Sequence, residues 1–106
     1  MITEENAMNA HHYLKETDLE CAELKSQVGY LDEIRKITRA ELFLEFEGTV
    51  AEREMRAMSH PRYKDRVLAL QVGTANYEAM KNRRFTANQQ IELFRTESAN
   101  MRRTSI

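Results

Sequence analysis

The sequence is poor in the residues that break helices, because its 106 residues include only one proline and three glycines. A sheet protein of this length needs many tight turns, and Gly and Pro are the residues that usually form them. Their scarcity argues against a sheet protein and favours long helices. The length itself corresponds to a single domain.

Cysteine and long apolar runs are also scarce. Cys21 is the only cysteine, so no disulfide can form within the chain. No apolar run approaches the roughly 18 to 20 residues that a membrane-spanning helix needs. The acidic and polar start MITEEN resembles neither a signal peptide nor a transit peptide. We therefore expect a cytoplasmic protein with no membrane partner.

What the chain has in plenty is charge, at 31% Asp, Glu, Lys and Arg beside 42% apolar residues. The two signs are divided unevenly: residues 1–50 contain 5 basic and 11 acidic residues, whereas residues 51–106 contain 11 and 6. Such asymmetry can mark a nucleic-acid surface. It can also mark two helices that pair through complementary flanks, and we favour this structural interpretation.

The first part of the chain predicts one long helix, from about residue 4 to 47. Thr3 suits the N-cap position, and acidic residues follow it in the first turn. Residues at steps of three and four then form a coiled-coil seam: Leu14, Thr17, Cys21, Leu24, Val28 and Leu31. After Leu31 the pattern slips to Ile34, Ile37 and Leu44. Gly29 lies inside this helix, where a single glycine costs only about 1 kcal/mol.

The stretch after this helix predicts a corner with a short helix of its own. Gly48 suits the end of the first helix, because a left-handed residue is favoured there. Thr49 and Glu52 have the spacing of a capping box, which predicts a helix over about 50–58. Ser59 or His60 then caps a last helix that begins at Pro61 and runs to about 103.

The last helix has a heptad seam of its own, which also slips once: Tyr63, Val67, Leu70, Thr74 and Tyr77, then Met80, Arg84, Ala87, Ile91, Phe94, Ser98 and Met101. The slips near Leu31 and Tyr77 are equidistant from residue 54, as an antiparallel hairpin requires. Facing residue numbers should then sum to about 108, which places Leu24 near Arg84 and Phe46 near Tyr63. The predicted fold class is all-α, a long coiled-coil-like helical hairpin with a short connecting helix.

Self-association is the next prediction, because two helices of about 65 Å cannot close a compact core alone. Several large apolar side chains lie off the seam and would stay exposed to solvent in a monomer: Leu19, Tyr30, Phe43, Val72 and Phe85. We expect a homodimer that forms a four-helix bundle, with Phe85 closer to the intersubunit face than to solvent.

No residue constellation predicts catalysis, a metal site or a cofactor. His11 and His12 are adjacent and therefore point about 100° apart on a helix, so they cannot grip one metal ion together. Cys21 lies on the apolar seam with acidic neighbours, which raise a thiol pKa rather than lower it. We expect a protein that is not an enzyme.

Basic residues of the last helix are the candidate nucleic-acid site: Lys81, Arg84, Arg95, Arg102 and Arg103. Aromatic side chains interleave with them, and such mixtures can follow a phosphate backbone and stack on bases. The structural alternative is that Arg84 faces Glu20 and Glu23 across the hairpin and forms an interhelical salt bridge.

The corner and the last helix resemble small helical proteins encoded by tailed phages and prophages. The resemblance is carried by Gly48-Thr49-Val50-Ala51-Glu52-Arg53-Glu54, by Tyr63, and by Phe94-Arg95-Thr96 with Arg102-Arg103. It covers roughly residues 38 to 104. Because genes for such proteins often lie among those for recombination or replication, the resemblance implies an accessory role near DNA in the host cytoplasm.

Three hypotheses for function follow. The first is a non-enzymatic phage accessory protein that contacts a phage or host protein, and DNA in addition, in recombination or replication. The second is an inhibitor of a host nuclease or defence complex, whose acidic residues imitate a phosphate track: Glu16, Asp18, Glu20 and Glu23. The third is a structural spacer or virion component with no ligand of its own.

Overall fold

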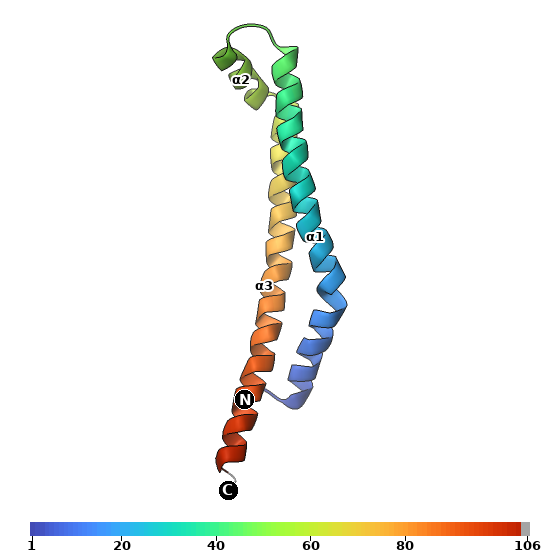
Figure 1. Cartoon of the computed structure of the whole chain (residues 1–106), viewed down its shortest axis with the longest axis vertical. Coiled ribbons are helices and arrows are strands. Elements are labelled where there is room, and N and C mark those ends of the chain that lie inside the picture. Colours follow the sequence, from blue (N-terminus) through green and yellow to red (C-terminus); the bar gives the residue numbers. More distant parts are fainter. Residues whose placement is uncertain (105–106) are drawn as a thin grey trace. The chain divides into compact units, whose positions relative to one another are not determined.

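The computed structural model describes residues 1–104, and every regular element within them is a helix. Helix α1 spans Glu4–Glu45, α2 spans Val50–Ser59 and α3 spans Pro61–Thr104 (Figure 1). The predicted all-α helical hairpin is confirmed, because α1 packs against α3. The chain divides into two compact units. Unit 1 contains Met1–Ala22 and the chain from Glu78 onward, and unit 2 contains Glu23–Tyr77.

Each helix begins at the N-cap that the sequence predicts. The Thr3 hydroxyl oxygen accepts a hydrogen bond from the amide of Asn6 at 3.1 Å, and the Thr49 hydroxyl accepts from the amide of Glu52 at 3.2 Å. His60, rather than Ser59, caps α3 through Nδ1, which accepts from the amide of Arg62 at 3.1 Å. No helix in residues 1–104 is both long and apolar enough to cross a membrane.

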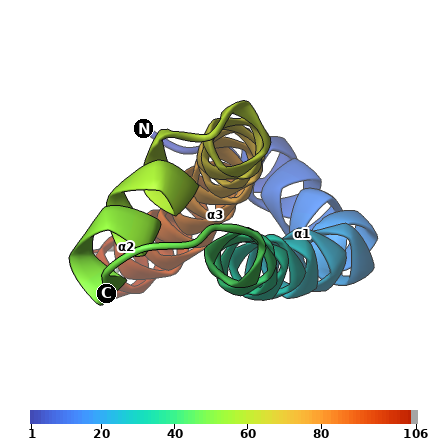
Figure 2. The same cartoon turned by 90° about the horizontal axis from the view of Figure 1, so that it is seen from above.

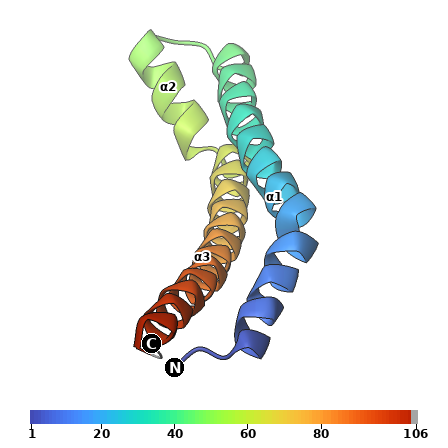
Figure 3. The ribbon, with the colours of Figure 1, turned by 60° about the horizontal axis from the view of Figure 1, so that its bottom comes forward.

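The corner of the hairpin depends on Gly48. Helix α1 ends at Glu45, two residues before the predicted end, and α2 then folds back toward the start of α3 (Figures 2 and 3). Gly48 has a φ of 121°, a conformation that side chains rarely adopt. A Cβ at this position would also lie 2.6 Å from Oε2 of Glu52. The turn between α1 and α2 therefore requires glycine.

All three helices meet in the core of unit 2. Leu42 of α1 and Ala57 of α2 are 0% exposed, and Tyr63 of α3 is 8% exposed. Phe46 packs against this cluster, as the predicted proximity to Tyr63 requires. Phe43 also packs against it, and the Arg53 guanidinium lies 4.1 Å from the centre of its ring. The expectation that Phe43 is exposed is therefore wrong, because α2 covers it.

The predicted slip of the first seam is wrong. Helix α1 turns one uninterrupted heptad row inward, here called the inner row: Ala7, Ala10, Leu14, Thr17, Cys21, Leu24, Val28, Leu31, Arg35, Thr38 and Leu42. Ile37 and Leu44 are 49% and 75% exposed, whereas Thr38 is 6% exposed. The sequence pattern misled because Arg35 and Thr38 are polar, and a search for apolar periodicity passes over them.

The slip predicted in the last helix is not needed either. A Cβ on Gly73 would lie 2.7 Å from Cδ1 of Leu31, so Gly73 occupies a seam position where the helices approach closely. Leu70, Gly73, Tyr77 and Met80 are then spaced by three, four and three residues, and Tyr63 lies one heptad before Leu70. Val67, which the prediction placed in the seam, is 40% exposed and lies outside this row. Because glycine has no apolar side chain, the search for apolar periodicity passed over Gly73 and placed Thr74 in the seam instead.

The predicted pairing sum of 108 holds only near the corner. In unit 2, Glu45 contacts Arg62, a sum of 107. In unit 1, Arg84 contacts Thr17, a sum of 101, and not Leu24. The rule assumed one constant offset along both helices, whereas the contacts in each unit follow the local fit of their side chains.

Candidate functional site

Arg84 joins the two helices of unit 1. Its Nη1 donates to the carbonyl oxygen of Leu14 and to Oγ1 of Thr17, both at 2.7 Å, and its Nη2 donates to Oδ1 of Asp18. The Arg84 side chain is only 22% exposed. The alternative prediction, that Arg84 forms an interhelical salt bridge, is therefore correct, although its partner is Asp18 rather than Glu20 or Glu23. Arg84 is not available to a phosphate backbone.

The other predicted basic residues lie on the surface of α3. Lys81 pairs with Glu78 at 3.3 Å and Arg95 pairs with Glu92 at 3.2 Å, each within one turn of the helix. Such local pairs partly offset the basic charge of this surface. Arg95 lies with Arg102 and Arg103 along a shallow depression of about 810 Å³ in the last turns of α3. These three residues are the part of the predicted set that the structure brings together.

The predicted acidic residues do not form one track. Asp18 is committed to Arg84, and at 100° per residue it points about 160° away from Glu16 on the helix. Glu16 and Glu20 are exposed in unit 1, whereas Glu23 belongs to unit 2. Asp18 stays on the surface, with a side chain that is 67% exposed, but its charge is offset by Arg84 and it does not share a helix face with Glu16.

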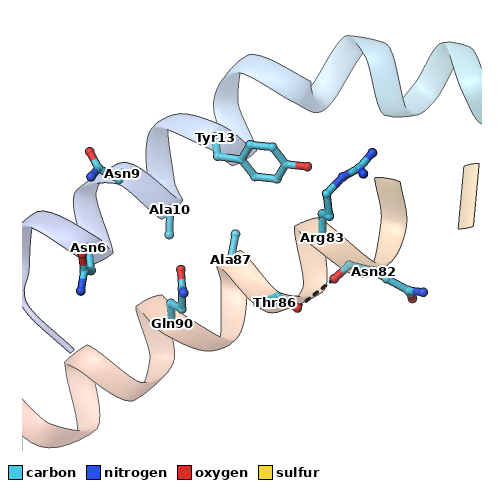
Figure 4. Close-up of a pocket in the computed structure, with 9 residues that line it drawn as sticks. All are labelled: Asn6, Asn9, Ala10, Tyr13, Asn82, Arg83, Thr86, Ala87 and Gln90. Carbon is cyan, nitrogen blue, oxygen red and sulfur yellow. Dashed lines mark hydrogen bonds between the residues drawn. The ribbon is translucent and has the colours of Figure 1, made fainter. Parts of the chain in front are cut away.

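A polar groove in unit 1 was not predicted (Figure 4). It has a volume of about 590 Å³, and the buried residues Ala10 and Ala87 form its floor. Polar side chains of both helices form its walls: Asn6, Asn9, Tyr13, Asn82, Arg83, Thr86 and Gln90. Side-chain amides can both donate and accept hydrogen bonds, and Arg83 adds a positive charge. The groove therefore combines hydrogen-bonding groups and one positive charge with an apolar floor.

Sequence reasoning missed this groove because its residues come from two segments that are about seventy positions apart. Polar side chains on a helix surface have no periodic signal that would mark them as a site. The one usable signal is the concentration of amides in residues 82–90, which contain two Asn and two Gln.

A second network holds α1 against α3 in unit 2. Arg35 donates through Nη1 to the hydroxyl of Tyr63 at 3.1 Å and through Nη2 to Oδ1 of Asp32 at 2.8 Å. Lys36 lies 3.2 Å from Oδ2 of the same carboxylate. Hydrogen bonds from Arg35 and Lys36 lower the pKa of Asp32 below its ordinary value of 3.8. The network is structural, because the basic groups are already paired.

His11, His12 and Cys21 are the residues for which the sequence raised the question of a metal site or a nucleophile. His11 and His12 are exposed, and their rings lie 6.2 Å apart at 55°. Cys21 is half-buried on the inner row. Among residues 1–104, no three His, Cys, Asp or Glu side chains could hold one metal ion.

No protein-family model, curated protein or solved structure matches the chain.

Proposed function

We propose that this chain is a non-enzymatic phage accessory protein that acts through protein contacts in recombination or replication in the host cytoplasm. One observation carries the proposal: large apolar side chains remain more than half exposed on all three helices. They include Leu19, Tyr30, Leu44, Met55, Leu68, Val72 and Phe85. Burying one such side chain is worth about 1.5 to 3 kcal/mol, so these surfaces favour contact with another protein.

The proposal includes a homodimer with Phe85 at its interface. Phe85 is 64% exposed in unit 1, which supports a role in association. Sedimentation at micromolar concentration should detect a dimer for the wild type and a monomer for Phe85→Ser. Met55→Ser is the control, because Met55 is 70% exposed but lies on α2 in unit 2. A wild-type protein that sediments as a monomer contradicts the dimer.

DNA contact, as part of the proposal, rests on Arg95, Arg102 and Arg103, since Arg84 is engaged in the fold. If the remaining arginines bind phosphates, DNA binding should weaken steeply with salt, because phosphate contacts release counterions. The triple change of Arg95, Arg102 and Arg103 to Ala should abolish this binding, and Arg66→Ala is the control in the other unit. Absence of binding at low salt contradicts the DNA contact alone.

A pull-down from host extract tests the proposal as a whole. Recovery of a single-strand-binding protein or a recombinase supports the accessory role. Recovery of a nuclease or a defence complex contradicts it and supports the inhibitor hypothesis, which the engagement of Asp18 by Arg84 otherwise weakens. A stable self-assembled protein that captures nothing supports a structural spacer.

A further inference from the structure

Helix α1 has a second heptad row, which the fold leaves largely exposed although Ile34 is half-buried. This outer row is spaced by four, three, four and three residues: Tyr30, Ile34, Ile37, Glu41 and Leu44. It lies roughly 110° around the helix from the inner row, at 100° per residue. Tyr30, Ile37 and Leu44 are 63%, 49% and 75% exposed. A heptad row of this kind is typical of a helix that packs against a further helix.

The two sides of the hairpin in unit 2 differ in what covers them. On one side α2 packs against α1, because Arg53 lies over the ring of Phe43 and donates to its carbonyl oxygen at 3.1 Å. Phe43 lies roughly 110° from the inner row in the direction opposite to the outer row. Helix α2 is thus a third helix that packs on one side of the hairpin. No helix within residues 1–104 packs on the other side.

A groove between α1 and α3 opens on the uncovered side. It has a volume of about 460 Å³, and residues of both helices line it: Leu24, Gln27, Leu31, Asp65, Leu68, Ala69, Val72, Gly73 and Asn76. Gln27 precedes Tyr30 by three residues, so the groove and the outer row adjoin on α1. Leu68 and Val72 are 58% and 54% exposed on the α3 side. We call this combined surface the outer face: Tyr30, Ile34, Ile37, Leu68 and Val72.

Three acidic residues lie beside the apolar residues of the outer face. Glu41 lies within the outer row, Glu23 lies on the same side of α1 at 100° per residue, and Asp65 lines the groove. None of these three carboxylates forms an ion pair within residues 1–104, where the ion pairs on nearby parts of unit 2 use other residues. A helix that covers this face must therefore bring positive charge, because unpaired carboxylates are costly to desolvate.

We propose that the outer face binds an amphipathic helix of a partner protein that is apolar on one side and has Lys or Arg along its edges. The proposal rests on the proposed function and specifies the chemistry of the partner. Apolar residues of the partner would fill the groove, and its basic edges would meet Glu23, Glu41 and Asp65. A second copy of this chain fits less well, because two outer faces would bring carboxylates against carboxylates.

A synthetic peptide of three heptads, with Leu at a and d and Lys elsewhere, is the direct probe. Fluorescence anisotropy should show that it binds the full chain at least about tenfold more tightly than a peptide with Glu in place of Lys. A scrambled peptide of the same Leu and Lys composition should also bind at least about tenfold more weakly, because it lacks an apolar face.

Variants of the chain locate the peptide. Ile37→Ser combined with Val72→Ser should weaken binding at least about tenfold, whereas Met55→Ser should not, since Met55 lies on α2 outside the outer face. Changing Glu23, Glu41 and Asp65 together to Gln should weaken binding and flatten its salt dependence. Because Ile37 and Val72 are about half exposed, these variants should still fold, and circular dichroism checks this.

Three results overturn the inference. In the first, the scrambled peptide binds as tightly as the amphipathic peptide. In the second, the variant with both Ile37→Ser and Val72→Ser still binds the peptide fully. In the third, the wild type is a dimer, and of the variants tested only this double variant is a monomer. The last result would assign the outer face to a second copy. If no peptide binds but host extract still yields a recombination or replication protein, only this inference fails. If neither binds, the proposed function fails as well.

Discussion

Leu31 and Gly73 lie against each other in unit 2, so close that a Cβ on Gly73 would be 2.7 Å from Cδ1 of Leu31. Gly29, the other glycine within a helix, has nothing within 4 Å of such a Cβ. Both glycines lower the intrinsic stability of their helices, but only Gly73 permits a close contact.

Gly29→Ala should therefore raise the free energy of unfolding by about 0.5 to 1 kcal/mol, which is the usual difference between the two residues in a helix. Gly73→Ala should give a smaller gain or a loss, because the side chain of Leu31 must move. Urea denaturation followed by circular dichroism measures both. Equal gains for the two variants would contradict the close contact.

Gly48→Ala should have the opposite effect to Gly29→Ala. The φ of 121° at Gly48 lies in a region that L-residues avoid, and the cost of forcing alanine into it is about 1 to 2 kcal/mol. The same denaturation experiment measures this loss. A Gly48→Ala variant as stable as the wild type would show that the corner tolerates another conformation.

Arg84→Ala should destabilise unit 1, because the half-buried guanidinium donates to Leu14 and Thr17. Losing such hydrogen bonds costs about 1 to 3 kcal/mol in total. Arg95→Ala is the matched control on the same helix, since its exposed pair with Glu92 should contribute less than about 1 kcal/mol. If both variants lose the same stability, Arg84 does not act as a cross-link.

Asp32 should make stability depend on acidic pH. Arg35 and Lys36 lower its pKa in the folded protein, so its contribution is present above the ordinary value of 3.8 and is lost as the pH falls through the lower folded pKa. Thermal melts of the wild type and Asp32→Asn should therefore differ most above pH 3.8 and converge on further acidification. A difference that grows at lower pH would contradict the direction of the shift.

The parts of the fold that depend on local chemistry were predictable from the sequence. The three N-caps, the helical class and the turn at Gly48 follow from residues within a few positions of one another. Such signals work because a cap or a turn is completed by its own neighbours along the chain.

The candidate sites depend on contacts between distant segments and were less predictable. Basic residues on α3 were recognised from their spacing, but the sequence could not show that Arg84 turns inward to Thr17 and Asp18. The polar groove was missed altogether, because Asn6 and Gln90 become neighbours only when α1 and α3 pack in unit 1.

By itself, the sequence of this protein determined that the chain is helical and that it turns back near Gly48. It also placed residues at heptad spacing on two rows of α1, which the pattern alone joined into one seam with a slip. Only the tertiary structure decided which row faces inward. The outer row, with Tyr30, Ile37 and Leu44, is the more apolar, yet it stays exposed. In unit 2 the inner row faces inward because Gly73 admits Leu31 closely, Ala57 and Tyr63 pack against Leu42, and the hydroxyl of Tyr63 accepts a hydrogen bond from Arg35. The close fit of side chains between the helices, rather than the apolar content of a row on α1, therefore decided which row of α1 faces inward.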